Sequence, residues 1–145
     1  MSMFGGMEIS ASALTAERLR MDVVAENLAN AQTTRGADGQ PYRRKEVVLQ
    51  ERAASFGASL SAAMSNGTSG GGVEVAGIAE DQTPLKRVYD PGHPDADAEG
   101  YVSMPNVDTV TEMVDLISAQ RAYEANVTAM QAAKQMFSRT LELLR

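Results

Sequence analysis

The chain has 145 residues, of which 43% are hydrophobic and only 5% aromatic, and its formal net charge is −6. This length suits one ordinary domain, and the acidic balance argues against nucleic acid as the main partner. The sequence contains no cysteine, which excludes disulfides, thiolate metal sites and cysteine nucleophiles. No apolar run approaches the roughly 20 residues that span a bilayer. The first residues lack the basic and apolar regions of a cleavable signal peptide.

A helical pattern follows a short start of small residues. We expect residues 1–11 to be flexible and residues 12–34 to form a helix, because apolar side chains recur there every three or four positions. Two asparagines, Asn27 and Asn30, either cap the helix end in solvent or form hydrogen bonds that fix the register of packed helices. The residues that we assign to an assembly face of this helix are Leu14, Met21, Val24, Leu28, Asn27 and Asn30.

The middle of the chain, residues 35–105, is predicted to be extended. Its β-branched residues predict one strand over 42–51 and another over 73–78. We expect the second strand to form a β-hairpin with residues 85–89, after a break at Pro84. Residues 53–72, between the two strands, are rich in Ala, Ser and Gly, and they predict a flexible insertion.

A long helix is predicted over residues 106–145, beginning with a capping box formed by Thr109 and Glu112. About 37 helical residues would form a rod roughly 55 Å long. From Leu116 onward an apolar residue returns at every seventh position, which is typical of helices that pack lengthwise. Polar residues in the same seam, Gln120 and Lys134, favour packing among several chains over a closed pair of helices. The residues that we assign to its assembly face are Met113, Leu116, Ile117, Tyr123, Asn126, Val127, Met130, Phe137, Leu141 and Leu144.

These elements predict a mainly α fold with a small β portion. The N- and C-terminal helices would pack as a coiled-coil-like axial core, and the middle segment would contain the β-hairpin. Such a chain has a thin core, so we expect its ordering to depend on assembly.

Residues that could support catalysis or metal binding are few. The single histidine, His93, lies in a proline-bracketed loop without a nucleophile placed beside it. Asp95, Asp97 and Gly100 match the opening of a Ca²⁺ loop, but the twelfth position, which requires a bidentate Glu, is Asn106. The basic residues 43–45 either contact an anionic partner or form a solvated strand face. We therefore expect no catalytic, cofactor-binding or metal-binding residues.

Three segments of the sequence resemble a known family. Residues 12–34, with the Asn27-x-x-Asn30 ending, and residues 112–127 are similar to the N- and C-terminal signatures of flagellar basal-body rod and hook proteins. The middle segment, with Tyr89-Asp90-Pro91-Gly92-His93-Pro94 followed by Gly100-Tyr101-Val102, resembles the proximal-rod members of that family. The resemblance covers most of the chain outside residues 53–72.

The resemblance implies a structural subunit without enzymatic activity or cofactor. Such subunits leave the cell through the flagellar type III export apparatus without signal cleavage. They polymerise into the rod that crosses the periplasm, encloses the export channel and transmits torque. The implied partners are copies of the chain, the rod proteins FlgB, FlgF and FlgG, and the FliE adaptor near the membrane ring, with no nucleic acid and no membrane insertion. The implied middle-segment contacts are Tyr89, Asp90, Pro91, His93 and Pro94. The alternatives are another rod- or hook-type axial protein, or a small Ca²⁺-binding helical module.

Overall fold

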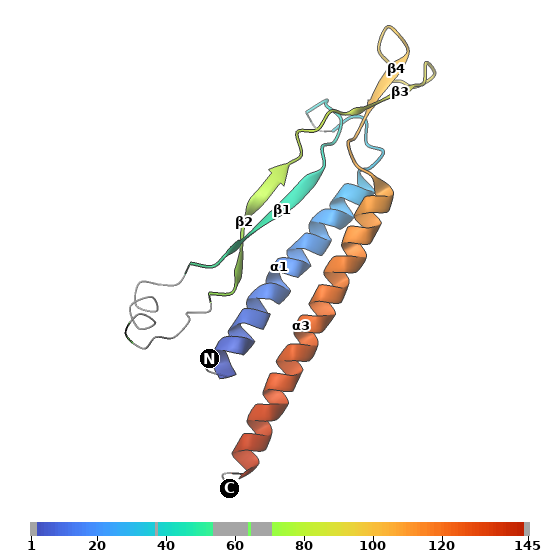
Figure 1. The fold of residues 1–145 in the computed structure, drawn as a ribbon. Helices are drawn as coiled ribbons and strands as arrows, with labels where there is room; N and C mark the ends of the chain where they lie inside the picture. The colour runs from blue at the N-terminus through green and yellow to red at the C-terminus, as the bar shows by residue number, and fades with distance from the viewer. Residues whose placement is uncertain (1–2, 37, 54–63, 65–70, 144–145) are drawn as a thin grey trace. The chain divides into compact units, whose positions relative to one another are not determined.

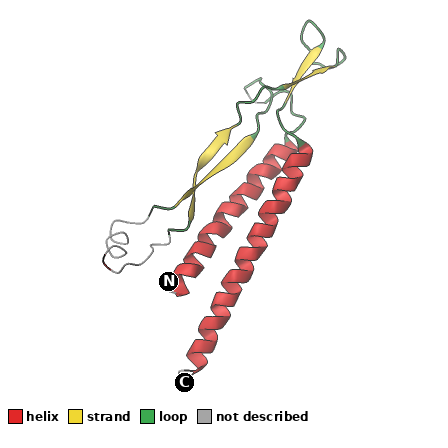
Figure 2. Cartoon of the chain, viewed as in Figure 1, coloured by secondary structure: helices red, strands yellow, loops and turns green. Residues whose placement is uncertain are grey.

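The computed structural model describes residues 3–36, 38–53, 64 and 71–143. Two long helices stand at the two ends of the sequence, with four short strands between them (Figures 1 and 2). Helix α1 spans Met3–Ala29 and helix α3 spans Thr109–Leu143. The strands are β1 (Lys45–Glu51), β2 (Val73–Glu80), β3 (Lys86–Tyr89) and β4 (Tyr101–Met104). The predicted fold class, mainly α with a small β portion, is confirmed.

The chain forms two compact units. Unit 1 comprises Met1–Leu19, Val48–Gly77 and Ala119–Arg145, and unit 2 comprises Arg20–Val47 and Ile78–Ser118. Each unit therefore contains part of both helices and part of both β1 and β2. Among the described residues of unit 1, Ala16 and Ala119 are buried, whereas the buried apolar side chains of unit 2 include Val23, Val24 and Val102.

Helix α1 begins at Met3, well before the predicted start at Ser12, and it ends at Ala29. Contacts within unit 1 explain the early start. The Ser12 hydroxyl accepts a hydrogen bond of 3.1 Å from the backbone N–H of Val73, and Glu8 lies 3.7 Å from Arg52. These tertiary contacts outweigh the low helix propensity of the glycines near the N-terminus, on which the prediction of a flexible start depended.

The strands do not pair as predicted. Strand β2 pairs with β1, and β3 pairs with β4 in antiparallel register, with Lys86 opposite Met104. The predicted hairpin between residues 73–78 and 85–89 is therefore wrong. The backbone N–H of Asp81 donates to the Arg44 carbonyl at 2.8 Å, which continues β2 along β1. The Asn106 side chain then donates to the Asp81 carbonyl and to the Thr83 hydroxyl, and the Thr83 backbone N–H donates to the Asp81 carboxylate.

The predicted capping box at the start of α3 is also wrong. Asp108 caps the helix instead, because its carboxylate accepts from the Val110 backbone N–H and from the Thr111 hydroxyl. This leaves the carboxylate of Glu112 available for other partners. Most of the Gly/Ser-rich stretch 53–72 lies outside the described residues, so its predicted flexibility stays a prediction. Over the part of the chain that is described, neither helix is apolar enough along its length to cross a membrane.

Candidate assembly surfaces and the polar cluster of unit 2

A buried asparagine lies at the centre of unit 2. The Asn27 amide donates hydrogen bonds to the Lys45 carbonyl at 2.8 Å and to the Glu112 carboxylate at 3.0 Å. Its carbonyl oxygen accepts from the Tyr42 hydroxyl and from the Lys45 backbone N–H, both at 2.9 Å. Asn27 and Glu112 are both 0% exposed. We call the group formed by Asn27, Tyr42, Arg44, Lys45 and Glu112 the polar cluster.

The charge of Glu112 is balanced by Arg44. The Arg44 Nε donates to Glu112 at 2.5 Å, and another guanidinium nitrogen donates to Asp115 at 3.3 Å. The hydrogen bond to Glu112 is the main reason that the pKa of Arg44 is raised. The Arg44 backbone N–H donates to the Asn106 side chain at 2.8 Å. A buried carboxylate is tolerated only when it is paired and hydrogen-bonded, and Glu112 meets both conditions.

Tyr42 and Lys45 complete the polar cluster on the side of β1. Burial raises the pKa of Tyr42 to about 12, with smaller contributions from the carboxylates of Glu26, Glu112 and Glu80. The Lys45 ammonium binds Glu26 at 2.6 Å and lies 5.5 Å from the centre of the Tyr42 ring. The neutral phenol of Tyr42 therefore acts as a hydrogen-bond donor to Asn27 throughout the physiological pH range.

The polar cluster joins the end of α1, the start of β1 and the start of α3 within one chain. A further ion pair, 3.8 Å between Arg20 and Asp115, links the same two helices. Our expectation that the helices pack among several chains rather than as a pair is therefore incomplete, because they contact each other directly in unit 2. Of the two signature asparagines, Asn30 bonds locally to the Glu26 carbonyl and to Thr33 at the helix end, whereas Asn27 connects separate elements.

Sequence reasoning missed Tyr42, Arg44 and Glu112 as members of one site. The spacing of Glu112, Leu116, Ala119 and Tyr123 places the carboxylate on the same side of α3 as the apolar seam. An acidic residue in an apolar stripe requires a buried partner, and this signal could have identified the site. The sequence predicts a solvated strand face or an anion contact for the basic residues 43–45, whereas Arg44 is the buried partner of Glu112.

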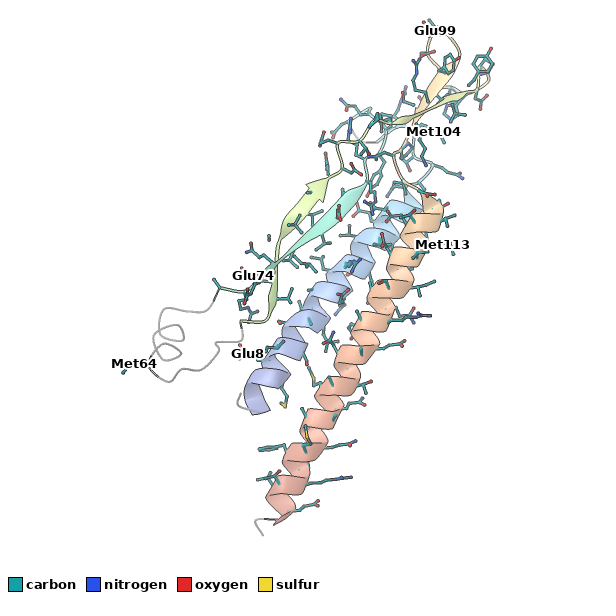
Figure 3. The ribbon with its side chains drawn as sticks, in the orientation of Figure 1. Glu8, Met64, Glu74, Glu99, Met104 and Met113 are labelled. Carbon is teal, nitrogen blue, oxygen red and sulfur yellow. The ribbon has the colours of Figure 1, made fainter. Side chains whose placement is uncertain are left out.

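The residues assigned to assembly faces differ in their exposure. Val24 and Asn27 are buried within the chain, and Leu144 lies outside the described residues. The half-buried ones are Leu14, Met21, Leu28, Asn30, Leu116, Tyr123, Asn126, Val127 and Met130, and the exposed ones are Met113, Ile117, Phe137 and Leu141. Two exposed residues near Met113, which is labelled in Figure 3, were missed: Val110 and Val114. Their roles as contacts between subunits stay predictions.

The β3–β4 hairpin carries an ordered aromatic pair. The rings of Tyr89 and Tyr101 meet edge to face with centres 5.3 Å apart, and the Arg87 guanidinium lies 4.9 Å from the centre of the Tyr101 ring. Tyr89, Asp90, Pro91 and Pro94 of the predicted middle-segment contacts are exposed, whereas His93 is half-buried. The His93 Nδ1 accepts from the Asp95 backbone N–H at 3.1 Å, so His93 has a local structural role in this loop.

The carboxylates of the Ca²⁺-like segment are engaged by protein donors. Asp95 binds the Thr34 hydroxyl at 2.9 Å and the Arg35 guanidinium at 2.7 Å. Asp97 accepts from the backbone N–H groups of Tyr101 and Glu99, and the Tyr101 N–H is the main reason that the pKa of Asp97 is lowered. Within the described ranges, no three His, Asp or Glu side chains come together as metal ligands.

The two helices lie largely within segments that match models of known protein families. The model for "Flagella basal body rod protein" matches residues 7–37, and the model for "Flagellar basal body rod FlgEFG protein C-terminal" matches residues 98–143. The FlgC flagellar basal-body rod protein of Bacillus subtilis (strain 168) is 54% identical over 148 residues, with 99% of each chain covered. The chain belongs to the FlgC family of flagellar basal-body rod proteins.

Other members of the FlgC family are similarly close over their full lengths. The protein from Escherichia coli O6:H1 is 49% identical, with 99% of this chain and 98% of the relative covered. The protein from Borreliella burgdorferi is 45% identical, with 100% and 99% covered. Asn27 falls in the N-terminal family match and Glu112 in the C-terminal one. The polar cluster therefore connects the two segments by which the rod family models match the chain.

Proposed function

We propose that the chain is a structural subunit of the proximal rod of the bacterial flagellum. It polymerises through its terminal helices into the axial drive shaft that encloses the export channel and transmits torque. The observation that carries this proposal is the full-length similarity to FlgC rod proteins from three distant bacteria. The exposed apolar side chains on α3 support it, because such rows on a protein surface mark sites of interaction.

In the proposed subunit, the polar cluster fixes how the end of α1 and the start of α3 pack within unit 2. Hydrogen bonds from Asn27 and Arg44 to Glu112 hold the end of α1 against the start of α3. Because these two helix segments are fixed against each other in unit 2, every copy would present the same outer helix surfaces to its neighbours, as packing in a regular polymer requires. Torque would then be carried by many lengthwise helix contacts rather than by a single site.

The proposal includes partners and location. We expect contacts with copies of the chain, with FlgB, FlgF and FlgG, and with the FliE adaptor, after export through the flagellar type III apparatus into the periplasm. The exposed Tyr89 side chain and its neighbours Asp90, Pro91 and Pro94, with the half-buried His93, are the proposed middle-segment contacts with adjacent subunits. The proposal assigns no catalytic role to any residue.

Deletion of the gene in the source bacterium tests this function. We expect a strain without rods, hooks or swimming, which a plasmid copy of the gene restores, and we expect the chain in basal bodies purified from the restored strain. The structural readout is electron microscopy of basal bodies from both strains. Complete rods in the deletion strain would overturn the proposal.

A further inference from the structure

The chain contains nine methionines, and solvent reaches some of them more easily than others. On helix α3, Met113 is 54% exposed and Met136 is 55% exposed. Met113 lies near the start of this helix (Figure 3). The half-buried methionines include Met7, Met21, Met104 and Met130. Because an oxidant attacks the sulfur atoms that it can reach, Met113 and Met136 should be oxidised before the half-buried methionines of the folded chain.

Met113 and Met136 are equally exposed, but their neighbours on the helix differ. Residues three and four positions apart lie side by side on a helix. For Met113 these neighbours include Val110 and Ile117, which are 68% and 48% exposed. For Met136 they are Ala132, Ala133, Arg139 and Thr140. Met113 therefore lies in an exposed apolar patch, whereas Met136 is surrounded on its side of the helix by small and polar residues.

The start of α3 is held in unit 2 by the residue that precedes Met113. Glu112 is 0% exposed, and its carboxylate binds Asn27 and Arg44. Met113, one position further along the helix, keeps more than half of its surface in solvent. A polar atom added to the Met113 side chain can therefore be hydrated in the free chain, and we expect α3 to keep its place in unit 2.

We propose that Met113 is a site of reversible oxidation by hydrogen peroxide, and that the oxidised chain is not incorporated into the rod. The Met113 Sδ atom attacks one oxygen of the peroxide, so that an S–O bond forms and the O–O bond breaks. The second oxygen leaves as water, with both hydrogens of the peroxide. Sulfur loses a pair of electrons, and the peroxide gains it. The product is a sulfoxide, which sulfoxide reductases return to the thioether.

A sulfoxide at Met113 changes what the apolar patch around it can pack against. The thioether is flexible and apolar, whereas the sulfoxide is polar and chiral. A neighbouring subunit that covered the patch would bury the new oxygen without a hydrogen-bond donor, which is unfavourable. This inference rests on the proposed rod function, because it requires that neighbours pack against α3. Oxidation acts on the free chain, since assembly would cover the sulfur.

Peptide mass spectrometry of the purified chain tests where oxidation occurs. The chain is treated with hydrogen peroxide for increasing times, and each methionine is followed by the gain of one oxygen atom in mass. We expect Met113 and Met136 to react at similar rates, several-fold faster than Met21 and Met104. In urea, where the fold no longer protects any sulfur, the rates should converge. Oxidation of Met21 or Met104 as fast as Met113 without urea would overturn the inference, whatever the function of the chain.

Substitutions in the source bacterium test the consequence for assembly. Met113→Gln imitates the polarity of the sulfoxide and should lower the number of complete basal bodies roughly tenfold, because it buries an unpaired polar group at a contact. Met113→Leu stays apolar and should assemble normally. Met136→Gln is the matched control, with the same exposure on the same helix, and should also assemble normally. Normal assembly with Met113→Gln would overturn the inference alone, whereas complete rods in the gene deletion strain would overturn the proposed function.

A peroxide pulse supplies a further measurement that does not depend on the folding of Met113→Gln. The pulse is given while rods assemble, to the parent strain and to the Met113→Leu strain. General oxidative damage is the same in both strains, so a difference between them reports on Met113. We expect Met113→Leu to form basal bodies at peroxide concentrations that block the parent. Equal sensitivity of the two strains would overturn the inference.

Discussion

The amide of Asn27 donates a hydrogen bond of 3.0 Å to the carboxylate of Glu112, although 85 positions separate the two residues in the sequence. Closing so long a loop costs conformational entropy, and the bond is one of several that offset this cost at the junction of α1 and α3. A buried polar contact also discriminates between alignments, because a shifted helix would break the bond between these two buried groups. The pair therefore sets which turn of α1 lies against which turn of α3.

Replacement of Asn27 by Leu should destabilise the chain strongly. The substitution removes a donor and an acceptor and leaves Glu112, the Lys45 backbone and the Tyr42 hydroxyl short of partners. We expect a loss of about 3–5 kcal/mol in the free energy of unfolding, measured by urea denaturation followed by circular dichroism. The matched control is Asn30→Ala, which loses only local bonds at the helix end and should cost about 1 kcal/mol or less. Equal losses for the two variants would contradict the central role of Asn27.

Neutralisation of Glu112 tests the ion pair separately from the hydrogen bonds. Glu112→Gln keeps the shape and an acceptor oxygen but leaves the Arg44 guanidinium without its buried countercharge. We expect a loss of about 3 kcal/mol, seen as a lower urea midpoint. Asp115→Asn removes the other, partly exposed partner of Arg44 and should cost less than about 1 kcal/mol. A larger effect at Asp115 than at Glu112 would show that the wrong carboxylate had been assigned as the main partner.

The raised pKa of Tyr42 predicts that the folded chain loses stability at alkaline pH. Its pKa is raised to about 12 in the folded chain, against about 10 for an unfolded tyrosine. The folded state thus favours the neutral phenol, and this contribution is fully present below pH 10 and is lost as the pH rises through 10 to about 12. We expect the free energy of unfolding of the parent chain to fall more steeply over this window than that of Tyr42→Phe. Parallel curves for the two chains would show that Tyr42 ionises equally easily in both states.

Both helices and the fold class could be predicted from the sequence, because apolar side chains at helical spacing must be buried on one side. The start of α1 could not be predicted. Glycines near the N-terminus have low helix propensity, and the helix there depends on contacts of Glu8 and Ser12 with residues distant in the sequence. The strand partners could not be predicted for a similar reason. The sequence around Pro84 is compatible with a hairpin, whereas in the structure β2 pairs with β1 and the Asp81 backbone N–H donates to the Arg44 carbonyl at the end of this pair.

The polar cluster could not be predicted from the sequence, because the local pattern at the start of α3 has two interpretations. Thr109 and Glu112 have the spacing of a capping box, yet Asp108, one residue earlier, is an equally good cap and is the one used. Local rules cannot choose between the two, because the choice depends on Arg44 and Asn27, which the fold brings to Glu112 from other elements. Of the exposed apolar residues at the start of α3, the prediction includes Met113 and Ile117 but not Val110 and Val114.

Gly100 is required by the aromatic pair of the β3–β4 hairpin. Its φ is 81°, a left-handed conformation, and a Cβ added there would lie 3.0 Å from the Tyr89 ring and 3.3 Å from Pro91. Gly100→Ala should therefore cost about 1–3 kcal/mol through backbone strain and displace Tyr89 from Tyr101, which near-ultraviolet circular dichroism of the tyrosines would detect. Gly77→Ala is the matched control, because no atom lies within 4 Å of its added Cβ. That variant should be neutral or slightly stabilising. An unchanged tyrosine signal in Gly100→Ala would mean that the Tyr89–Tyr101 geometry is set by the strands and does not depend on Gly100.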